Sequence, residues 1–177
     1  MNEKESEHNQ NKLLEEWIRN QILQQLPQQY FDLMNDGSKL AKEGQFSKAA
    51  EKFASARKEV AGILRSLMEM KKDHREQEWQ FFGILWAFKL IKSVFYWLLA
   101  QSETAESLEE RKGYLLAAMG AQLVGTDMIP AFETLNQSFT GADLELLPLL
   151  GEAIRNHEHR QNLLEKALEA NGIEFKF

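Results

Sequence analysis

Residues 30–63, YFDLMNDGSKLAKEGQFSKAAEKFASARKEVAGI, constrain the fold of this chain more than any other segment. Two kinds of residue recur where a pair of crossing helices would need them: small residues at Gly37, Ala49 and Ala56, and aromatic residues at Phe46 and Phe53. Gly44 separates the two helical stretches, at a point where the chain must turn and a positive φ costs glycine least. The segment therefore predicts a closely packed helical hairpin.

The same pattern resembles one unit of the tetratricopeptide repeat, a helix–turn–helix that stacks into peptide-binding surfaces. The small residues, the turn glycine and both aromatic residues fall at the family's positions. Three positions depart from the family pattern: Leu33 replaces a Trp, Asp36 replaces a Leu, and Ala61 replaces a Pro. Because the terminal proline is missing, we expect the second helix to run on. The microtubule-interacting and transport domain resembles residues 45–56 about as well, over a shorter match.

The resemblance implies that the protein binds another protein or peptide and that the first hairpin helix lines the binding groove. The implied groove-facing residues are Phe31, Met34, Ser38, Ala41 and Lys42. Aromatic and methionine side chains with one lysine suit an apolar segment that has an acidic flank. One subclass binds a C-terminal carboxylate through Lys and Asn, but Met34 and Ser38 hold those places here. In a competing interpretation, Phe31 and Met34 pack against the preceding helix.

The composition favours a single all-α domain. Of 177 residues, 44% are hydrophobic, and only three prolines and ten glycines interrupt a sequence rich in helix-forming residues. The net charge of −6 argues against a nucleic-acid partner, because neutralising phosphates requires clustered Lys and Arg. The absence of cysteine excludes disulfides and thiolate nucleophiles. No apolar run follows a basic patch at the N-terminus, so we expect a cytoplasmic protein.

The spacing of apolar residues predicts about seven helices in an antiparallel bundle or short solenoid. A polar tail at 1–10 precedes a first helix that stops at Pro27; the hairpin occupies 28–70, a central aromatic hairpin 74–124, and the C-terminal helices 127–171. Helix starts are indicated by the capping pairs Asp73 with Glu76 and Ser107 with Glu110, and by Gly141 with Asp143. Gly125 and Thr126 are expected to end one helix, and Asp127 or Thr126 to cap the next.

The most apolar segment is 79–100, WQFFGILWAFKLIKSVFYWLLA. Each apolar residue favours membrane insertion by roughly 0.3 to 0.6 kcal/mol, whereas Lys89 and Lys92 each oppose it by about 2.5 to 3.5 kcal/mol. Both lysines share one face with Tyr96 and Glu103. One polar stripe on an apolar helix is typical of the central helix of a soluble bundle. The lysines either form a solvated stripe or meet the acidic groups of a partner.

The aromatic residues between Trp79 and Trp97 are more than one face of a thin bundle can bury. We therefore expect some of them to contact the terminal helices or a second copy, and we favour a homodimer. Contact of this helix with lipid or a membrane protein is the alternative to peptide binding.

Metal binding and catalysis have little support in the sequence. His157 and His159 are two residues apart, so on a helix they point in divergent directions. His157 continues the apolar face of Leu147, Leu150 and Ile154, which predicts a partly buried and hydrogen-bonded histidine. The sequence has neither a phosphate-binding glycine loop nor a nucleophile elbow. We expect no cofactor and no enzymatic activity, and interpret the chain as an adaptor, chaperone or assembly factor.

Overall fold

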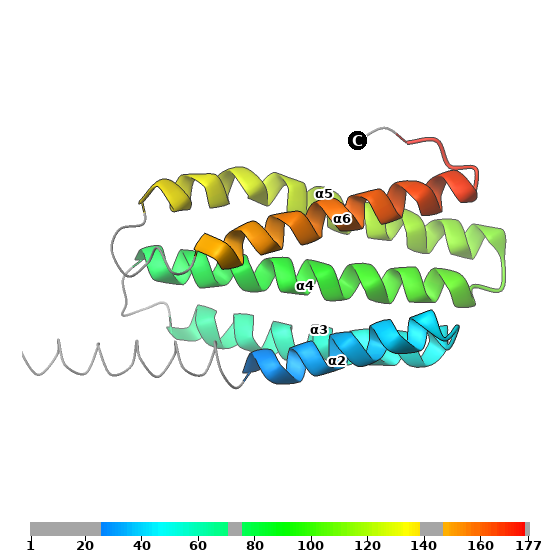
Figure 1. Ribbon diagram of the computed structural model, residues 1–177, viewed down its shortest axis with the longest axis horizontal. Coiled ribbons are helices and arrows are strands. Elements are labelled where there is room, and N and C mark those ends of the chain that lie inside the picture. Colours follow the sequence, from blue (N-terminus) through cyan, green and yellow to red (C-terminus); the bar gives the residue numbers. More distant parts are fainter. Residues whose placement is uncertain (1–25, 71–75, 139–146, 176–177) are drawn as a thin grey trace, which may run out of the picture.

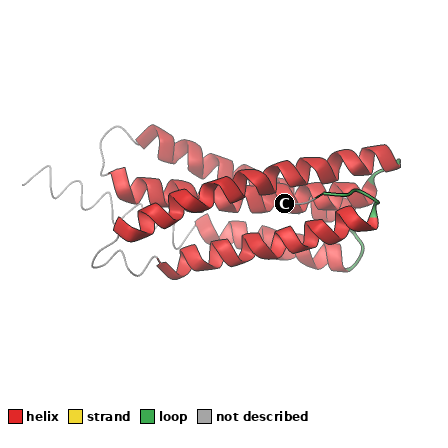
Figure 2. Ribbon diagram, turned by 90° about the horizontal axis from the view of Figure 1, so that it is seen from above, coloured by secondary structure: helices red, strands yellow, loops and turns green. Residues whose placement is uncertain are grey.

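A computed structural model describes residues 26–70, 76–138 and 147–175 of the chain. The helices in these ranges are α2 (Leu26–Lys42), α3 (Phe46–Met70), α4 (Glu76–Thr104), α5 (Leu108–Ser138) and α6 (Leu147–Ala170). Successive helices run antiparallel in an elongated bundle, and the turned view shows that the described segments are helices joined by loops (Figures 1 and 2). The all-α prediction is confirmed.

The predicted hairpin is formed by α2 and α3. Gly44 makes the turn with φ of 74°, and Ala49 and Ala56 are fully buried where the helices meet. A side chain on Gly37 would lie only 2.6 Å from the Phe53 ring, so glycine is what allows this ring to fill the crossing. The second helix does run on, to Met70. The small residues and Phe53 thus pack as the sequence predicted, whereas Phe46 is only partly buried and is not part of the core.

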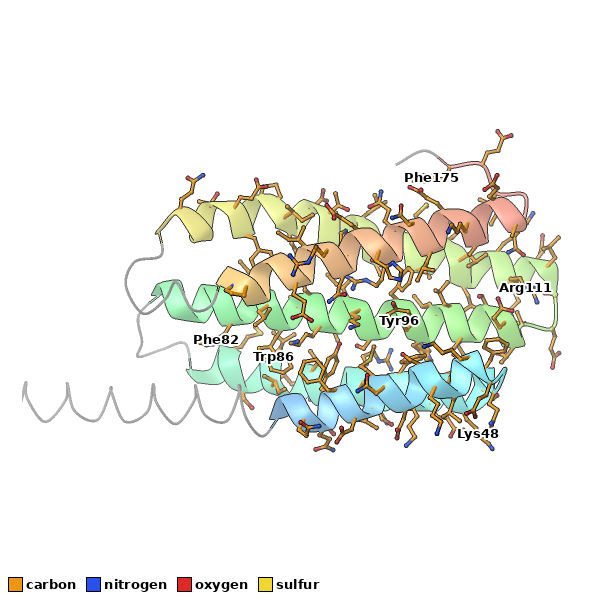
Figure 3. All side chains as sticks on the ribbon, viewed as in Figure 1. Lys48, Phe82, Trp86, Tyr96, Arg111 and Phe175 are labelled. Atoms are coloured by element: carbon orange, nitrogen blue, oxygen red, sulfur yellow. The ribbon has the colours of Figure 1, made fainter. Side chains whose placement is uncertain are left out.

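Helix α4 is the centre of the bundle. It runs between the α2/α3 pair on one side and the α5/α6 pair on the other (Figure 1) and packs against α3, α5 and α6. Its buried aromatic side chains are Phe82, Trp86, Phe88 and Phe95; the first two are labelled in Figure 3, as is Tyr96 further along the helix. A single chain buries these four rings, and the homodimer inferred from the aromatic residues of this segment stays a prediction.

The predicted break at Gly125 and Thr126 is wrong. Helix α5 continues unbroken through both residues and through Pro130, so two expected helices are one. The reason is tertiary, since a Cβ at Gly125 would lie 2.5 Å from the His157 ring of α6. Close packing against α6 therefore requires glycine inside this helix and outweighs its weak helical propensity. Asp127 lies within the helix and does not cap one.

The start of α5 was predicted correctly. The Glu110 backbone N–H donates to the Ser107 hydroxyl at 3.1 Å, which satisfies one of the open donors of the first turn. Helix α6 ends at Ala170, followed by Gly172 with φ of 68°, close to the predicted end. The expected helix before Pro27, the Asp73 cap, and the start at Gly141 and Asp143 lie outside the described residues.

Candidate functional site

The groove-facing residues predicted on α2 divide into surface and core. Phe31 is 39% exposed, and Lys42 is exposed in the last turn of the helix. Met34 is only 4% exposed and belongs to the core, so it is not a surface contact. Ser38 is partly buried, and its hydroxyl donates to the Met34 carbonyl at 2.8 Å. Ala41 packs against the core. Phe31 and Lys42 are the members of this set that α2 presents to the outside.

Lys89 of α4 lies among aromatic rings and not in open solvent. Its Nζ is 4.6 Å from the ring centroid of Phe31, 5.4 Å from that of Tyr30 and 5.5 Å from that of Trp86. We call these three residues the aromatic cage; a ring face attracts a cation through its quadrupole. The Tyr30 hydroxyl donates to the Lys89 carbonyl at 3.3 Å and ties α2 to α4. Two residues that the sequence suggested independently, Phe31 and Lys89, are therefore in contact.

A polar network joins α5 to α6 through Gln122, Thr126, His157 and Arg160; Thr126 is exposed at its edge, and the other three residues are buried. The Arg160 Nε donates to the Gln122 Oε1 at 3.0 Å, and a terminal guanidinium nitrogen contacts the His157 Nδ1 at 3.3 Å. The Gln122 amide donates to the His157 carbonyl at 3.1 Å. The Thr126 hydroxyl donates to the Gln122 carbonyl at 3.1 Å and lies 3.0 Å from the His157 Nε2. Each member is bonded to at least one other.

The network determines the tautomer of His157. Arginine has no acceptor, so the Nδ1 that contacts Arg160 must be unprotonated, and the proton resides on Nε2. Nε2 then donates to the Thr126 hydroxyl. Burial, together with the positive charge of Arg160, lowers the pKa of His157 to about 4. His157 is hydrogen-bonded as predicted and, at 1% exposure, is more deeply buried than expected.

The same arrangement is unsuited to activating a nucleophile. A hydroxyl beside an imidazole is the geometry of an activated threonine, provided that a carboxylate or another acceptor orients the second ring nitrogen. Here that nitrogen faces the guanidinium of Arg160, which makes the ring a weaker base. The imidazole cannot hold the hydroxyl proton of Thr126 near neutral pH. The network is better suited to positioning Arg160.

Three cations of α4 and α6 lie within electrostatic reach of one another in turn: Lys92 acts on Lys89, and Arg160 acts on Lys92. We call Lys89, Lys92 and Arg160 the cationic cluster. Burial, and then the nearby charge of Lys92, lowers the pKa of Lys89 to about 8. Burial, and then the charge of Arg160, lowers the pKa of Lys92. Both lysines are partly buried, which differs from a fully solvated stripe. Arg160 is 1% exposed, and burial lowers its pKa to about 10, so it stays protonated at neutral pH.

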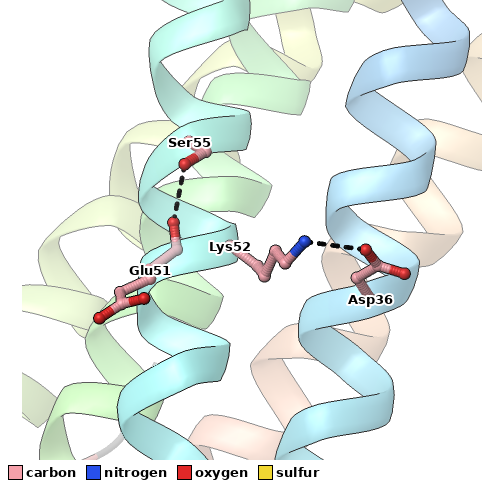
Figure 4. A network of polar contacts seen from close by, with 4 residues as sticks. All are labelled: Asp36, Glu51, Lys52 and Ser55. Carbon is pink, nitrogen blue, oxygen red and sulfur yellow. Dashed lines mark hydrogen bonds and ion pairs between the residues drawn. The ribbon is translucent and has the colours of Figure 1, made fainter.

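Among the described residues, no carboxylate forms an ion pair with the cationic cluster. The ion pair found there within 4 Å is Lys52 with Asp36, at 3.0 Å on the surface between α2 and α3 (Figure 4). The close-up also shows the Ser55 hydroxyl donating to the Glu51 carbonyl at 2.9 Å. Glu152 of α6 acts on both lysines through space without forming an ion pair. Within the described part of the chain, the cluster is thus not neutralised by a direct ion pair.

Sequence reasoning missed Arg160, Gln122, Thr126 and Tyr30 as site residues. A signal was present on α6, where His157 and Arg160 continue into the buried Leu164 and Leu168 at helical spacing. A charged residue in register with an apolar stripe indicates a buried cation. Gln122 lies similarly on the α5 face of Leu115 and Ala118. What periodicity could not reveal is that these two faces meet each other.

Comparisons of the chain with known proteins found no related protein. No protein-family model matches the chain, and no curated protein or solved structure is significantly similar to it. The tetratricopeptide-like resemblance therefore stays a prediction resting on residues 30–63. Within the described ranges, no group of three His, Asp or Glu side chains could hold a metal ion. Phe82–Thr104 and Leu108–Thr134 are long and apolar enough to cross a membrane, by length and composition only.

Proposed function

We propose that this protein is a non-catalytic interaction module that binds another polypeptide, in the role of an adaptor, chaperone or assembly factor. The observation that carries the proposal is the contact between Phe31 and Lys89, which places an exposed aromatic ring and a cation side by side. Aromatic side chains act as anchors at protein interfaces, and cations steer and orient an acidic partner. Lys92 extends the same surface along α4.

The tetratricopeptide-like resemblance supports the same role for α2. It implies a helix whose exposed face contacts a peptide, and α2 exposes Phe31 and Lys42. Lys39 and Lys42 in the last turn add positive charge to one end of the helix. An apolar segment with acidic residues near it is the partner that this surface would recognise.

The test is site-specific photo-crosslinking from position 31, with a matched position at Ser55 on the exposed face of α3. We expect a photoreactive aromatic residue at 31 to capture a polypeptide partner in native lysate and the same residue at 55 to capture none. Phe31→Ala should weaken the captured complex by about 2 kcal/mol while circular dichroism stays unchanged. A folded Phe31→Ala protein with native affinity for the partner would show that the ring only packs within the bundle.

A membrane-peripheral or oligomeric role is the second candidate, and α5 provides the observation that favours it. This helix exposes four large apolar side chains, Leu108, Leu116, Leu123 and Val124. The described aromatic residues of α4 are mostly buried, so α5, not α4, would contact lipid or a second copy. Two measurements on the native chain and on the paired variant Leu123→Glu with Val124→Glu separate these roles from binding at Phe31. Vesicle flotation tests membrane contact, and light scattering tests oligomer formation. Flotation that the paired variant abolishes would favour the membrane.

A further inference from the structure

Arg160 is a buried cation whose hydrogen-bond partners among the described residues, Gln122 and His157, are neutral. Its guanidinium is bonded to an amide oxygen of Gln122 and a ring nitrogen of His157. Taking a charge out of water is expensive unless an opposite charge is close, and neutral acceptors offset only part of that cost. The His157 tautomer and the Gln122 amide hold the guanidinium in one orientation. The fold thus keeps a positive charge fixed and incompletely balanced.

Lys89 and Lys92 add to this imbalance in the same place. They lie one helical turn apart on α4, and the positive charge of Arg160 lowers the pKa of Lys92, as a neighbouring cation does. The exposed Glu152 acts on both lysines in the opposite direction but forms no ion pair with the cluster among the described residues. The chain as a whole carries −6, so the local excess of cations is opposite to its overall charge.

Hydrogen-bond donors gather near these cations. Lysine, arginine and the indole N–H are donors that cannot accept. The Nε1 of Trp86, a member of the aromatic cage, is a buried donor without a partner among the described residues. The Tyr30 hydroxyl uses its proton on the Lys89 carbonyl. Several donors beside positive charges are complementary to a group that is negatively charged and rich in acceptors.

We propose that Lys89, Lys92 and Arg160 form a binding site for a carboxylate, supplied by an Asp or Glu side chain of a polypeptide partner. The inference rests on the proposed function, since the carboxylate is the anion that an unmodified polypeptide provides. Lys89 and Lys92 are partly exposed and meet the incoming group, while Arg160 supplies a fixed charge behind them. Phe31, at the edge of the aromatic cage, would contact the apolar residues that flank the acidic one.

The test uses short acetylated and amidated oligoglutamate as the probe, oligoglutamine as its uncharged match, and inorganic phosphate as a free oxoanion. Binding is followed on the full chain by nuclear magnetic resonance of the Arg160 Nε–H and of the Trp indole N–H groups. We expect oligoglutamate to shift the Arg160 signal and oligoglutamine to leave it unchanged. Lys92→Gln should weaken oligoglutamate binding about tenfold, equivalent to about 1.4 kcal/mol.

Lys48→Gln is the matched control, because it removes the same charge from an exposed position near the start of α3, away from Trp86 of the aromatic cage in Figure 3. It should change the affinity less than twofold, a small effect typical of a remote exposed charge. Equal effects of Lys92→Gln and Lys48→Gln, or no shift with oligoglutamate, would overturn the site. Phosphate that binds while oligoglutamate does not would overturn the assignment to a polypeptide carboxylate. A partner crosslinked at position 31 whose affinity is unchanged by Lys92→Gln would support the proposed function and refute this inference.

Discussion

The α2/α3 hairpin and the α5/α6 pair hold helices together with opposite chemistry. Between α2 and α3, Gly37 admits the Phe53 ring, and the alanines allow close approach; the ion pair of Asp36 with Lys52 lies on the surface. Between α5 and α6, Gly125 admits the His157 ring, and Gln122 and Arg160 are buried with it. Glycine serves the same geometric purpose in both. The first interface is stabilised by apolar burial, whereas the second depends on completing hydrogen bonds.

The largest loss of stability should follow removal of the Phe53 ring from the α2/α3 interface. Phe53→Ala should lower the free energy of unfolding by about 3 to 5 kcal/mol, because it leaves a cavity where α2, α3 and α4 meet. Chemical denaturation measures the loss, with Leu116→Ala on exposed α5 as the control. A loss below that of Leu116→Ala would show that the hairpin is not held by this ring.

Acidification should act on the α5/α6 pair and spare the hairpin. The pKa of His157 is lowered to about 4, so the unfolded chain takes up a proton first as pH falls from about 6.5. The stabilisation that His157 provides above pH 6.5 is therefore lost as pH falls toward 4, on the order of 3 kcal/mol in total.

The measurement is denaturant unfolding between pH 7 and pH 4.5 for the native chain, His157→Gln and His159→Gln. The His157→Gln protein should be less stable at pH 7 and should lose less stability on acidification. His159 is exposed on the same helix, so its replacement should leave the native pH dependence intact. Parallel pH profiles for all three proteins would contradict the assigned role of His157.

Adding one methyl group at Gly125 should separate the α5/α6 pair. Gly125→Ala places a Cβ against the His157 ring, and we expect it to cost about 1 to 3 kcal/mol. Gly120→Ala on the same helix meets nothing within 4 Å and should stabilise by up to about 1 kcal/mol through helical propensity. The sign difference between the two thermal midpoints is the readout. Stabilisation by both substitutions would refute the close contact.

The smallest effect belongs to the surface ion pair of the hairpin. Lys52→Ala should change the free energy of unfolding by roughly 0 to 1 kcal/mol, because both partners are largely in water. The double variant with Asp36→Ala completes a mutant cycle. A coupling energy well above that range would mean that electrostatics contributes to the α2/α3 interface as it does to α5/α6.

The sequence alone determined the helical class, the hairpin of residues 30–63, the Ser107 cap and the central position of α4. These features follow from spacing within one segment, which repeats every turn or two and needs no knowledge of the partner helix. The sequence likewise identified four polar or exposed positions on their own helices: Phe31, Lys42, Lys89 and Lys92.

Only the tertiary structure decided that α5 is unbroken, that Met34 is core and that Arg160 joins the lysines. Each of those depends on which face of a distant helix packs there, and contacts between remote segments leave no periodic trace along the chain.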